Sequence, residues 1–250
     1  MTDLYYEVHG TGAPLVLAHS PGADSREWRF ITPVLAQTHT VLTFDGRGAG
    51  QSPVPVTPTN YVEDLRDLLD DLRLTTVTLV GHSLSGQVVT DFALTYPHRV
   101  SRLVLLGPGL SGYQFSPAYQ QLYARVQAAA PDVEKMTAVS LDFPSYRVVM
   151  ASPQRDFMMA MTRDNMQKML KWKNTEQVWP QPPAIERLTT LATPTLFILG
   201  TQDSEDLFRI AEEFKRAPDV RFAHIEGADH MPTLTHPQAV AGLIAQFVGE

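Results

Sequence analysis

The most informative part of the sequence reads Thr76-Val-Thr-Leu-Val-Gly81-His82-Ser83-Leu84-Ser85-Gly86. Its β-branched, apolar first half predicts a buried strand, and a helical pattern follows it. A strand, a sharp turn and a helix in this order place Ser83 at the tip of a nucleophile elbow. Because strand and helix approach closely at such a turn, only small residues fit two positions before and after the serine. Gly81 and Ser85 meet this requirement, so we predict that Ser83 is a nucleophile.

The rest of the chain alternates short apolar runs with helical patterns. Strands are expected at 5–9, 15–18, 40–44, 77–80, 103–106, 195–199 and 221–225, and helices at 61–72, 85–96, 207–217 and 237–247. The middle strands are apolar throughout, which is typical of parallel strands that are covered on both faces. This alternation predicts a doubly wound, mostly parallel α/β sheet.

One segment, residues 111–187, breaks the alternation. It holds seven of the nine methionines, and it carries nine basic and seven acidic residues in a chain of formal net charge −7. Helices are expected within it at 118–130, 132–140 and 154–173, without strands. We therefore predict an α/β core of residues 1–110 and 188–250, with residues 111–187 inserted as a helical cap, or lid. Such a cap would cover the carboxyl ends of the strands, where α/β sheets bind ligands.

A serine hydroxyl becomes a good nucleophile only when a base accepts its proton. Of the eight histidines, His230 lies in a glycine-containing loop after the last expected strand. A loop at the carboxyl end of a strand can hold a base over the sheet. This position favours His230 over His236, which follows six residues later.

The base in turn needs a carboxylate that orients it and stabilises the imidazolium. Asp203 comes just after the expected strand at 195–199. Glu205 and Asp206 are alternatives, but they begin a helix, where acidic side chains are favoured by the helix dipole. The predicted order is therefore serine, aspartate, histidine, as in α/β-hydrolases and unlike chymotrypsin or subtilisin.

Composition excludes several other classes of protein. The chain has 250 residues, 44% of them hydrophobic and 19% charged, which is typical of a globular fold and not of a disordered chain or a coiled coil. The absence of cysteine excludes disulfides, thiolate metal sites and a cysteine nucleophile. The net charge of −7 argues against nucleic-acid binding. No apolar run approaches the roughly 20 residues that span a bilayer, and the first residues do not resemble a signal peptide. We expect a cytoplasmic protein with no membrane partner and no metal.

Several motifs together resemble the α/β-hydrolase superfamily, in its branch of small-molecule esterases, lactonases and cofactor-free haloperoxidases. Residues 15–28 resemble the family's oxyanion loop, and residues 44–52 resemble its Asp-x-Arg-Gly-x-Gly-x-Ser loop, for which the family implies a structural role. Residues 77–109, 195–203 and 225–237 resemble the elbow, acid and histidine segments. The resemblance implies a Ser83, Asp203 and His230 triad that needs no cofactor.

The oxyanion loop departs from the family pattern. The resemblance implies one backbone N–H donor at Leu84 and a second at the position of Pro21, but proline has no N–H. The Gly22 N–H or the Ser20 hydroxyl could replace it, or the reaction could need only one strong donor. Losing one such donor costs on the order of 100–1,000-fold in turnover.

The methionines of the cap recur at helical spacing, which indicates a stripe that packs the cap onto the core or lines an adaptable apolar pocket. For the substrate pocket we expect the following residues: His82, Met158, Met161, Trp172 and Met231.

The predicted function is that of a serine hydrolase that cleaves a small carboxylic ester or lactone through an acyl-enzyme on Ser83. Ser20-Pro-Gly22-Ala-Asp resembles the enol-lactonases of aromatic degradation. The alternatives are a carbon–carbon bond hydrolase or a perhydrolase on the same triad, or a small-ligand receptor with little turnover. We expect a small-molecule substrate and a monomer or homodimer.

Overall fold

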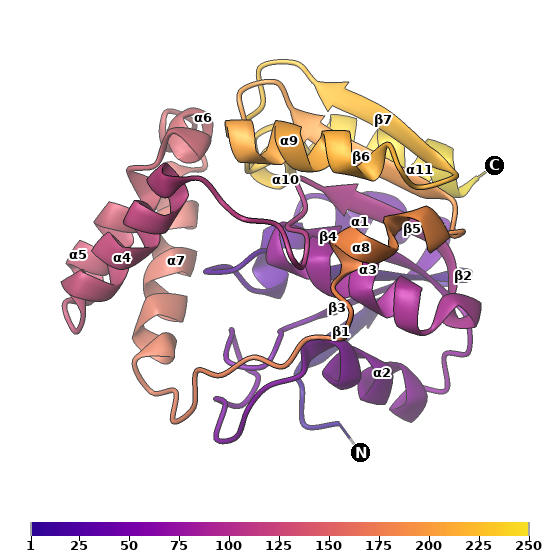
Figure 1. Cartoon of the computed structure of the whole chain (residues 1–250), viewed down its shortest axis with the longest axis horizontal. Helices are drawn as coiled ribbons and strands as arrows, with labels where there is room; N and C mark the ends of the chain where they lie inside the picture. The colour runs from indigo at the N-terminus through magenta and orange to yellow at the C-terminus, as the bar shows by residue number, and fades with distance from the viewer. Residues whose placement is uncertain (1, 250) are drawn as a thin grey trace.

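A computed structural model of the protein describes residues 2–249. Its centre is a seven-stranded sheet in the order β1-β3-β2-β4-β5-β6-β7 (Figure 1). Only β1 runs antiparallel to its neighbour, and the other strands are parallel. The strands are Tyr6–His9 (β1), Ala13–Ala18 (β2), His39–Phe44 (β3), Val77–His82 (β4), Val100–Leu106 (β5), Thr195–Gly200 (β6) and Val220–Ile225 (β7). This confirms the predicted mostly parallel α/β sheet.

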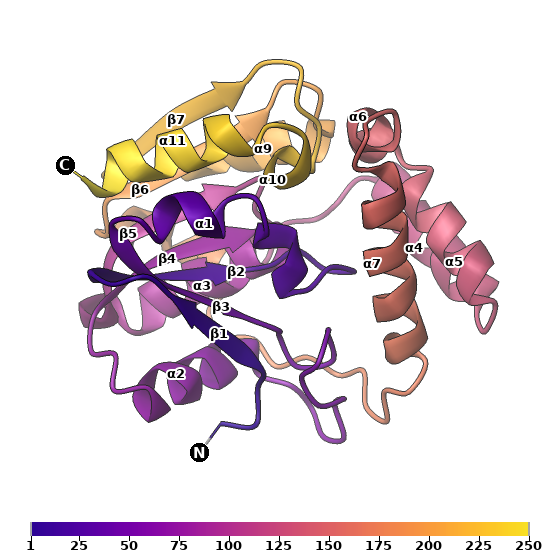
Figure 2. The ribbon, with the colours of Figure 1, turned by 180° about the vertical axis from the view of Figure 1, so that it is seen from behind.

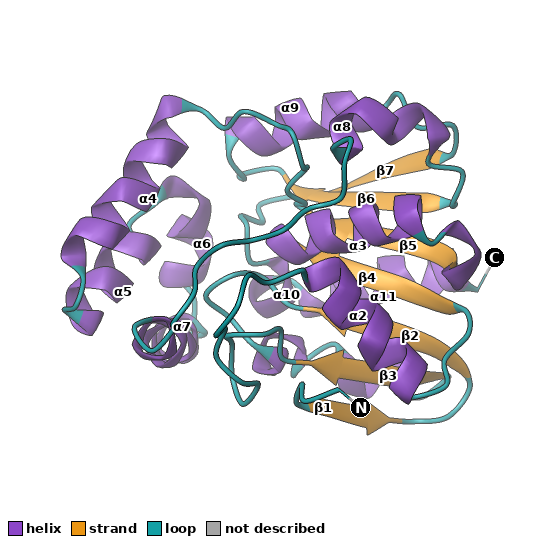
Figure 3. Ribbon diagram, turned by 60° about the horizontal axis from the view of Figure 1, so that its bottom comes forward, coloured by secondary structure: helices purple, strands orange, loops and turns teal. Residues whose placement is uncertain are grey.

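Helices cover both faces of the sheet (Figure 3). On one face lie Tyr61–Asp71 (α2), Leu84–Thr95 (α3), Ala184–Arg187 (α8) and Glu205–Phe214 (α9), whose apolar side chains share one core with the strands. On the other face lie the 3₁₀-helix Ser25–Trp28 (η1), Thr32–Leu35 (α1) and Pro237–Val248 (α11), which form a second core. Leu79 and Val80, neighbours in β4, point into opposite cores. Both faces of the central strands are therefore buried, which explains why their sequences are apolar throughout.

The sequence pattern missed the shortest helices. Thr32–Leu35, Arg147–Met150 (α6), Ala184–Arg187 and Pro232–Thr235 (α10) have four residues each. One turn is too short to show an amphipathic period, so these helices depend on contacts with the rest of the chain.

The segment between β5 and β6 contains helices that stand away from the sheet (Figures 1 and 2). They are Pro117–Ala129 (α4), Val133–Leu141 (α5), α6 and Arg155–Met169 (α7). We call residues 117–169 the helical insertion. Val126, Met136 and Met166 pack between α4, α5 and α7, so the insertion has a small core of its own. The chain then returns along the sheet, where Thr59 and Gln177 form an isolated bridge.

Polar contacts fasten the far end of α7 to the loop after β3. The Asn165 side chain accepts a hydrogen bond from the Gly50 N–H at 2.9 Å and donates one to Asp24 at 2.8 Å. The Lys168 ammonium donates to the carbonyl oxygens of Gly50, at 2.6 Å, and Ser52. These contacts hold the insertion in one position over the core.

Candidate active site

Ser83 lies at the sharp turn between β4 and α3. Its backbone angles, φ 56° and ψ −120°, are in a region that non-glycine residues rarely adopt. The Ser83 N–H donates to the Leu106 carbonyl at 3.0 Å, and the Ser83 carbonyl accepts from the Gly109 N–H at 2.8 Å. Such strain costs about 1–3 kcal/mol and persists where the surrounding structure enforces it, often at functional sites.

The neighbours of Ser83 show why small residues are needed at this turn. A Cβ on Gly81 would lie 2.5 Å from the Ser85 carbonyl oxygen and from Val89 Cγ2. Ser85, which replaces a glycine in the motif, donates its hydroxyl hydrogen to the His19 carbonyl at 2.5 Å. The serine therefore connects the elbow to the loop after β2.

Asp203 and His230 are in contact. The His230 Nδ1 lies 2.8 Å from Asp203 Oδ2, and both side chains are largely buried. Burial alone would lower the pKa of His230, but the Asp203 carboxylate outweighs it and raises that pKa above its ordinary value. Gly107, at φ 43°, faces this pair, and a Cβ there would lie 3.2 Å from both side chains. Glycine thus leaves room for the contact.

The alternatives to these two residues have other partners. Asp206 accepts hydrogen bonds from the Tyr113 hydroxyl at 3.0 Å and the Ser116 hydroxyl at 2.7 Å, so it holds the start of α4. His236 lies 2.9 Å from the hydroxyl of its neighbour Thr235.

The loops that follow parallel strands bring the three predicted residues to one edge of the sheet. Ser83, Asp203 and His230 come after β4, β6 and β7. The ring of His230 lies 4.9 Å from that of His82, the residue before Ser83. His230 is therefore beside the elbow.

The loop after β2 faces the same site. The Ser20 N–H and the Ser20 hydroxyl both donate to Glu27 Oε2, at 2.8 and 2.7 Å, so the hydroxyl already has an acceptor. The Ala23 N–H donates to the Ser20 carbonyl at 3.2 Å, which closes a turn with Gly22 at φ 75°. Within residues 2–249, the N–H groups of Gly22 and Leu84 have no protein acceptor. They are the candidate oxyanion donors, since Pro21 has none.

A model of the alpha/beta hydrolase family matches residues 15–243. The chain belongs to this family. A hydrolase from Pseudomonas aeruginosa PA01 has a similar structure, with a TM-score of 0.80 and 28% identity over 99% of this chain and 94% of that one. The pimeloyl-[acyl-carrier protein] methyl ester esterase of Aeromonas hydrophila is 26% identical over 97% of this chain and 98% of its own. The esterase of Exiguobacterium antarcticum, at 20% identity and a TM-score of 0.79 over 99% and 96% of the two chains, shares the fold.

One buried residue of this alpha/beta hydrolase was not found from the sequence. Glu27 is completely buried in η1, and its Oε1 lies 2.5 Å from His82 Nδ1. Burial would raise the pKa of Glu27, but His82 and the Ser20 donors outweigh it and lower that pKa. Glu27 lies in a polar run, Asp24-Ser-Arg-Glu, that resembles a surface loop. Its position directly before the buried Trp28 is the only local signal.

The predicted pocket residues divide into two groups. Met158, Met161 and Met231 lie together, in a cluster with Ala23 and Leu234 that joins the helical insertion to the core. His82 and Trp172 lie outside this cluster, and their place in the substrate pocket stays a prediction. His82 is 1% exposed and its Nδ1 is bound to Glu27. The Trp172 indole donates to the Gly48 carbonyl at 3.1 Å, because the chain has turned past α7 onto the loop after β3.

The insertion also contacts the loop that carries His230. Asp229 Oδ2 accepts from the backbone N–H groups of Val148 and Val149, at 2.7 and 2.9 Å. The His230 N–H donates to the Ser145 carbonyl at 2.9 Å. Between these contacts, the Tyr146 ring lies edge-on to the His230 ring, with centroids 6.0 Å apart. Tyr146 was not predicted, because this segment has no helical period.

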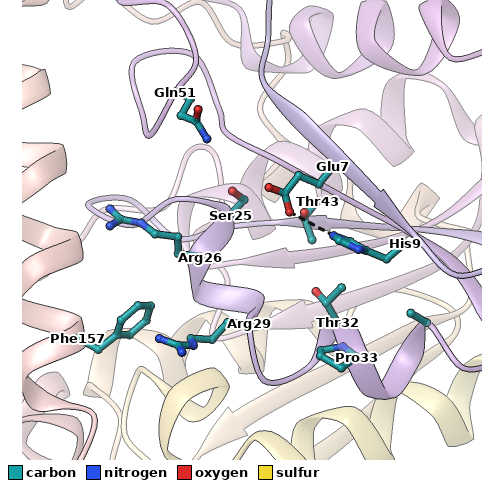
Figure 4. Close-up of a pocket in the computed structure, with 11 residues that line it drawn as sticks. Glu7, His9, Ser25, Arg26, Arg29, Thr32, Pro33, Thr43, Gln51 and Phe157 are labelled. Carbon is teal, nitrogen blue, oxygen red and sulfur yellow. Dashed lines mark hydrogen bonds and ion pairs between the residues drawn. The ribbon is translucent and has the colours of Figure 1, made fainter.

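A hollow lies beside β1, η1 and α1 (Figure 4). Its wall includes Glu7, Arg26, Arg29 and Phe157, with the Arg29 guanidinium 4.6 Å from the centre of the Phe157 ring. Neither Ser83 nor His230 lines it, so it is separate from the candidate active site.

Within residues 2–249, no group of three or more histidine, aspartate or glutamate side chains is arranged to hold a metal ion. None of the helices in the same range is long and apolar enough to cross a membrane.

Proposed function

We propose that this hydrolase cleaves a small carboxylic ester or lactone through an acyl-enzyme on Ser83. The contact between Asp203 Oδ2 and His230 Nδ1 carries the proposal. An Nδ1–H that donates to the carboxylate leaves Nε2 of the same ring as the basic nitrogen. A base oriented in this way beside the elbow can accept the proton of the Ser83 hydroxyl.

In the reaction, the Ser83 Oγ attacks the carbonyl carbon while His230 Nε2 takes the hydroxyl proton. The N–H groups of Leu84 and Gly22 stabilise the negative charge on the carbonyl oxygen. His230 then returns the proton to the leaving alcohol, and the acyl group stays on Ser83. Water, deprotonated by His230, attacks the acyl-enzyme, releases the carboxylic acid and restores the serine.

The surroundings of the site favour an uncharged, partly apolar acyl group. Met158, Met161 and Met231 lie in the cluster between the insertion and the core, and methionine adapts to irregular apolar shapes. The relative from Aeromonas hydrophila, an esterase by name, matches nearly the whole chain. We propose that residues 111–187 act as the cap of the substrate pocket.

Active-site titration with a fluorophosphonate tests the nucleophile. We expect one adduct per wild-type chain, none on Ser83→Ala, and full labelling of a control, Ser101→Ala, on the exposed start of β5. Equal labelling of wild type and Ser83→Ala would refute the proposal.

A substrate panel tests the reaction. p-Nitrophenyl esters of increasing acyl length should be hydrolysed with a burst of one p-nitrophenol per active site, and a set of lactones should be opened to their hydroxy acids. Labelling of Ser83 without turnover of any ester or lactone would refute ester hydrolysis. Turnover of dicarbonyl substrates, assayed beside the esters and lactones, would then indicate carbon–carbon cleavage. No turnover of any of the three would indicate a receptor.

A further inference from the structure

The proposed mechanism leaves one buried ionisable pair unused. Glu27 and His82 are 0% and 1% exposed, and their closest atoms are 2.5 Å apart. His82 directly precedes the nucleophile in sequence, and its ring lies against the His230 ring, with centroids 4.9 Å apart. Removing a carboxylate from water is costly, and replacing a buried pair with apolar residues is often neutral or stabilising. Stability alone is therefore a weak explanation for this pair.

The contacts of Glu27 connect three separate segments. Its Oε2 accepts both donors of Ser20, in the loop after β2, and its Oε1 binds His82, at the end of β4. Glu27 itself belongs to η1. The carboxylate is thus the common point between the loop that carries Gly22 and the strand that carries the nucleophile.

A second set of bonds supports the same loop from its other side. The His19 carbonyl accepts from the Ser85 hydroxyl, and His19 Nε2 accepts from the Gly46 N–H at 2.9 Å. The remaining His19 nitrogen, Nδ1, donates to the Ser20 carbonyl at 2.8 Å. Ser20 is therefore held at its carbonyl, its N–H and its hydroxyl, which fixes the turn from Ser20 to Ala23.

We propose that Glu27 is a positioning residue for the hydrolase reaction, which holds the Ser20–Ala23 turn against the elbow so that the Gly22 N–H serves as the second oxyanion donor. The inference rests on the proposed function. The family resemblance implies the second oxyanion donor at Pro21, which has no N–H. With the turn held in this way, the Gly22 N–H takes the place of that missing donor. A backbone N–H stabilises an oxyanion only if it is fixed before the charge develops, and Glu27 provides this fixation. His82 is the anchor of Glu27.

The charge of Glu27 has a separate effect on His230. The groups that surround His230 are Asp203, Asp229, Glu27, Tyr146 and His82. Among them, the Glu27 carboxylate helps Asp203 and Asp229 to raise the pKa of His230. Removing this charge should therefore shift the acid limb of the kcat/KM profile to lower pH. A purely structural role of Glu27 would not produce this shift.

The test compares Glu27→Gln, which keeps the shape and one acceptor oxygen, with Glu27→Ala. The measurements are kcat and KM on a p-nitrophenyl ester and the dissociation constants of a trifluoromethyl ketone and of a carboxylate product. The ketone forms an oxyanion on Ser83 and the product does not. For Glu27→Ala we expect kcat to fall on the order of 100–1,000-fold, as for the loss of an oxyanion donor. Ketone affinity should fall with it, while KM and product affinity should change by less than about threefold. For Glu27→Gln we expect a smaller fall, of roughly tenfold, together with the shift to lower pH.

Variants of His82 separate anchoring from packing. In His82→Asn the amide N–H replaces the Nδ1 donor, so ketone affinity should stay within about threefold of wild type. His82→Leu fills the space without a donor and should resemble Glu27→Ala. The matched control is Asp91→Asn, because Asp91 is also fully buried but lies in α3 and binds Arg187. This control should change the melting temperature and leave kcat/KM within about twofold.

The inference is overturned if Glu27→Gln, folded by circular dichroism, keeps wild-type kcat, ketone affinity and pH profile. It is also overturned if kcat falls while ketone affinity does not. Failure of the proposed function gives a different result, since the wild type would then form no adduct on Ser83, and both conclusions would be lost together.

Discussion

Replacing Asp203 with asparagine tests the candidate triad most directly. The side chain keeps its size, but the negative charge that lies 2.8 Å from His230 Nδ1 is lost. Two unit charges about 4 Å apart interact by about 4 kcal/mol at an effective dielectric constant of 20. At a pH above the midpoint of the His230 titration the imidazolium forms only during turnover, so this stabilisation acts on the transition state. A loss of about 4 kcal/mol corresponds to roughly a thousandfold fall in kcat.

The pH profile of Asp203→Asn should change in a defined direction. Asp203 raises the pKa of His230 above the ordinary imidazole value of 6.5. The base is active when it is neutral, so wild-type kcat/KM should rise with pH through a midpoint above 6.5. Without the carboxylate the midpoint should move to lower pH, while the plateau falls. Stopped-flow hydrolysis of p-nitrophenyl acetate between pH 5 and 9 measures both effects.

The control for this experiment is Asp206→Asn, three residues later. Asp206 binds Tyr113 and Ser116 at the start of α4, so its variant should alter stability or KM and keep kcat within about threefold. The assignment of Asp203 is refuted if Asp203→Asn keeps kcat within a factor of three, or if Asp206→Asn loses as much.

Three further predictions concern stability and the helical insertion. Gly86→Ala places a Cβ 2.5 Å from Pro108 Cβ and should lower the free energy of unfolding, measured by urea titration, by about 1–3 kcal/mol. The control Gly242→Ala has open space around the new Cβ and should not lower the free energy of unfolding. Burial raises the pKa of Asp91 from 3.8 to about 6, so the folded state holds the Asp91 proton up to a higher pH than the unfolded state does. The free energy of unfolding of the wild type should therefore fall by about 3 kcal/mol as the pH rises from 4 to 6. Urea titrations of Asp91→Asn at a series of pH values should not show this fall in the free energy of unfolding. If the free energy of unfolding of Asp91→Asn falls with pH as steeply as that of wild type, the prediction is wrong. Lys168→Met removes the hydrogen bonds to the carbonyls of Gly50 and Ser52. This variant should speed limited proteolysis of the helical insertion and raise KM several-fold. Equal effects of the control Lys171→Met, at an exposed lysine, would show that these two bonds do not matter.

Local patterns were sufficient for the elbow. The strain at Ser83 arises from a strand, a turn and a helix that are contiguous in the chain, and the small residues around it are required by the same turn. The positions of Asp203 and His230 follow from a rule of topology, because parallel strands all end at one edge of the sheet. Each of these residues could therefore be predicted from its place after an apolar run.

Local patterns did not reveal side-chain contacts between residues that are far apart in sequence. Trp172 follows a helix of suitable period, but its indole binds Gly48, 124 residues earlier. Tyr146 lies in a segment without a period and reaches His230 only because Asp229 holds α6 in place. No window of sequence contains both partners, so hydrophobic periodicity could not reveal either contact.

The sequence by itself was enough to predict the candidate nucleophile, the order of the candidate triad and the mostly parallel sheet, since each depends on local chain geometry and on burial along a single segment. Only the tertiary structure decided how the oxyanion loop is supported. Glu27 looks like a surface residue in its own segment, and it becomes a buried anion only when His82, 55 residues later, and Ser20 are brought around it. A buried charge is tolerated when its partners are in place, and those partners come from different elements of the fold.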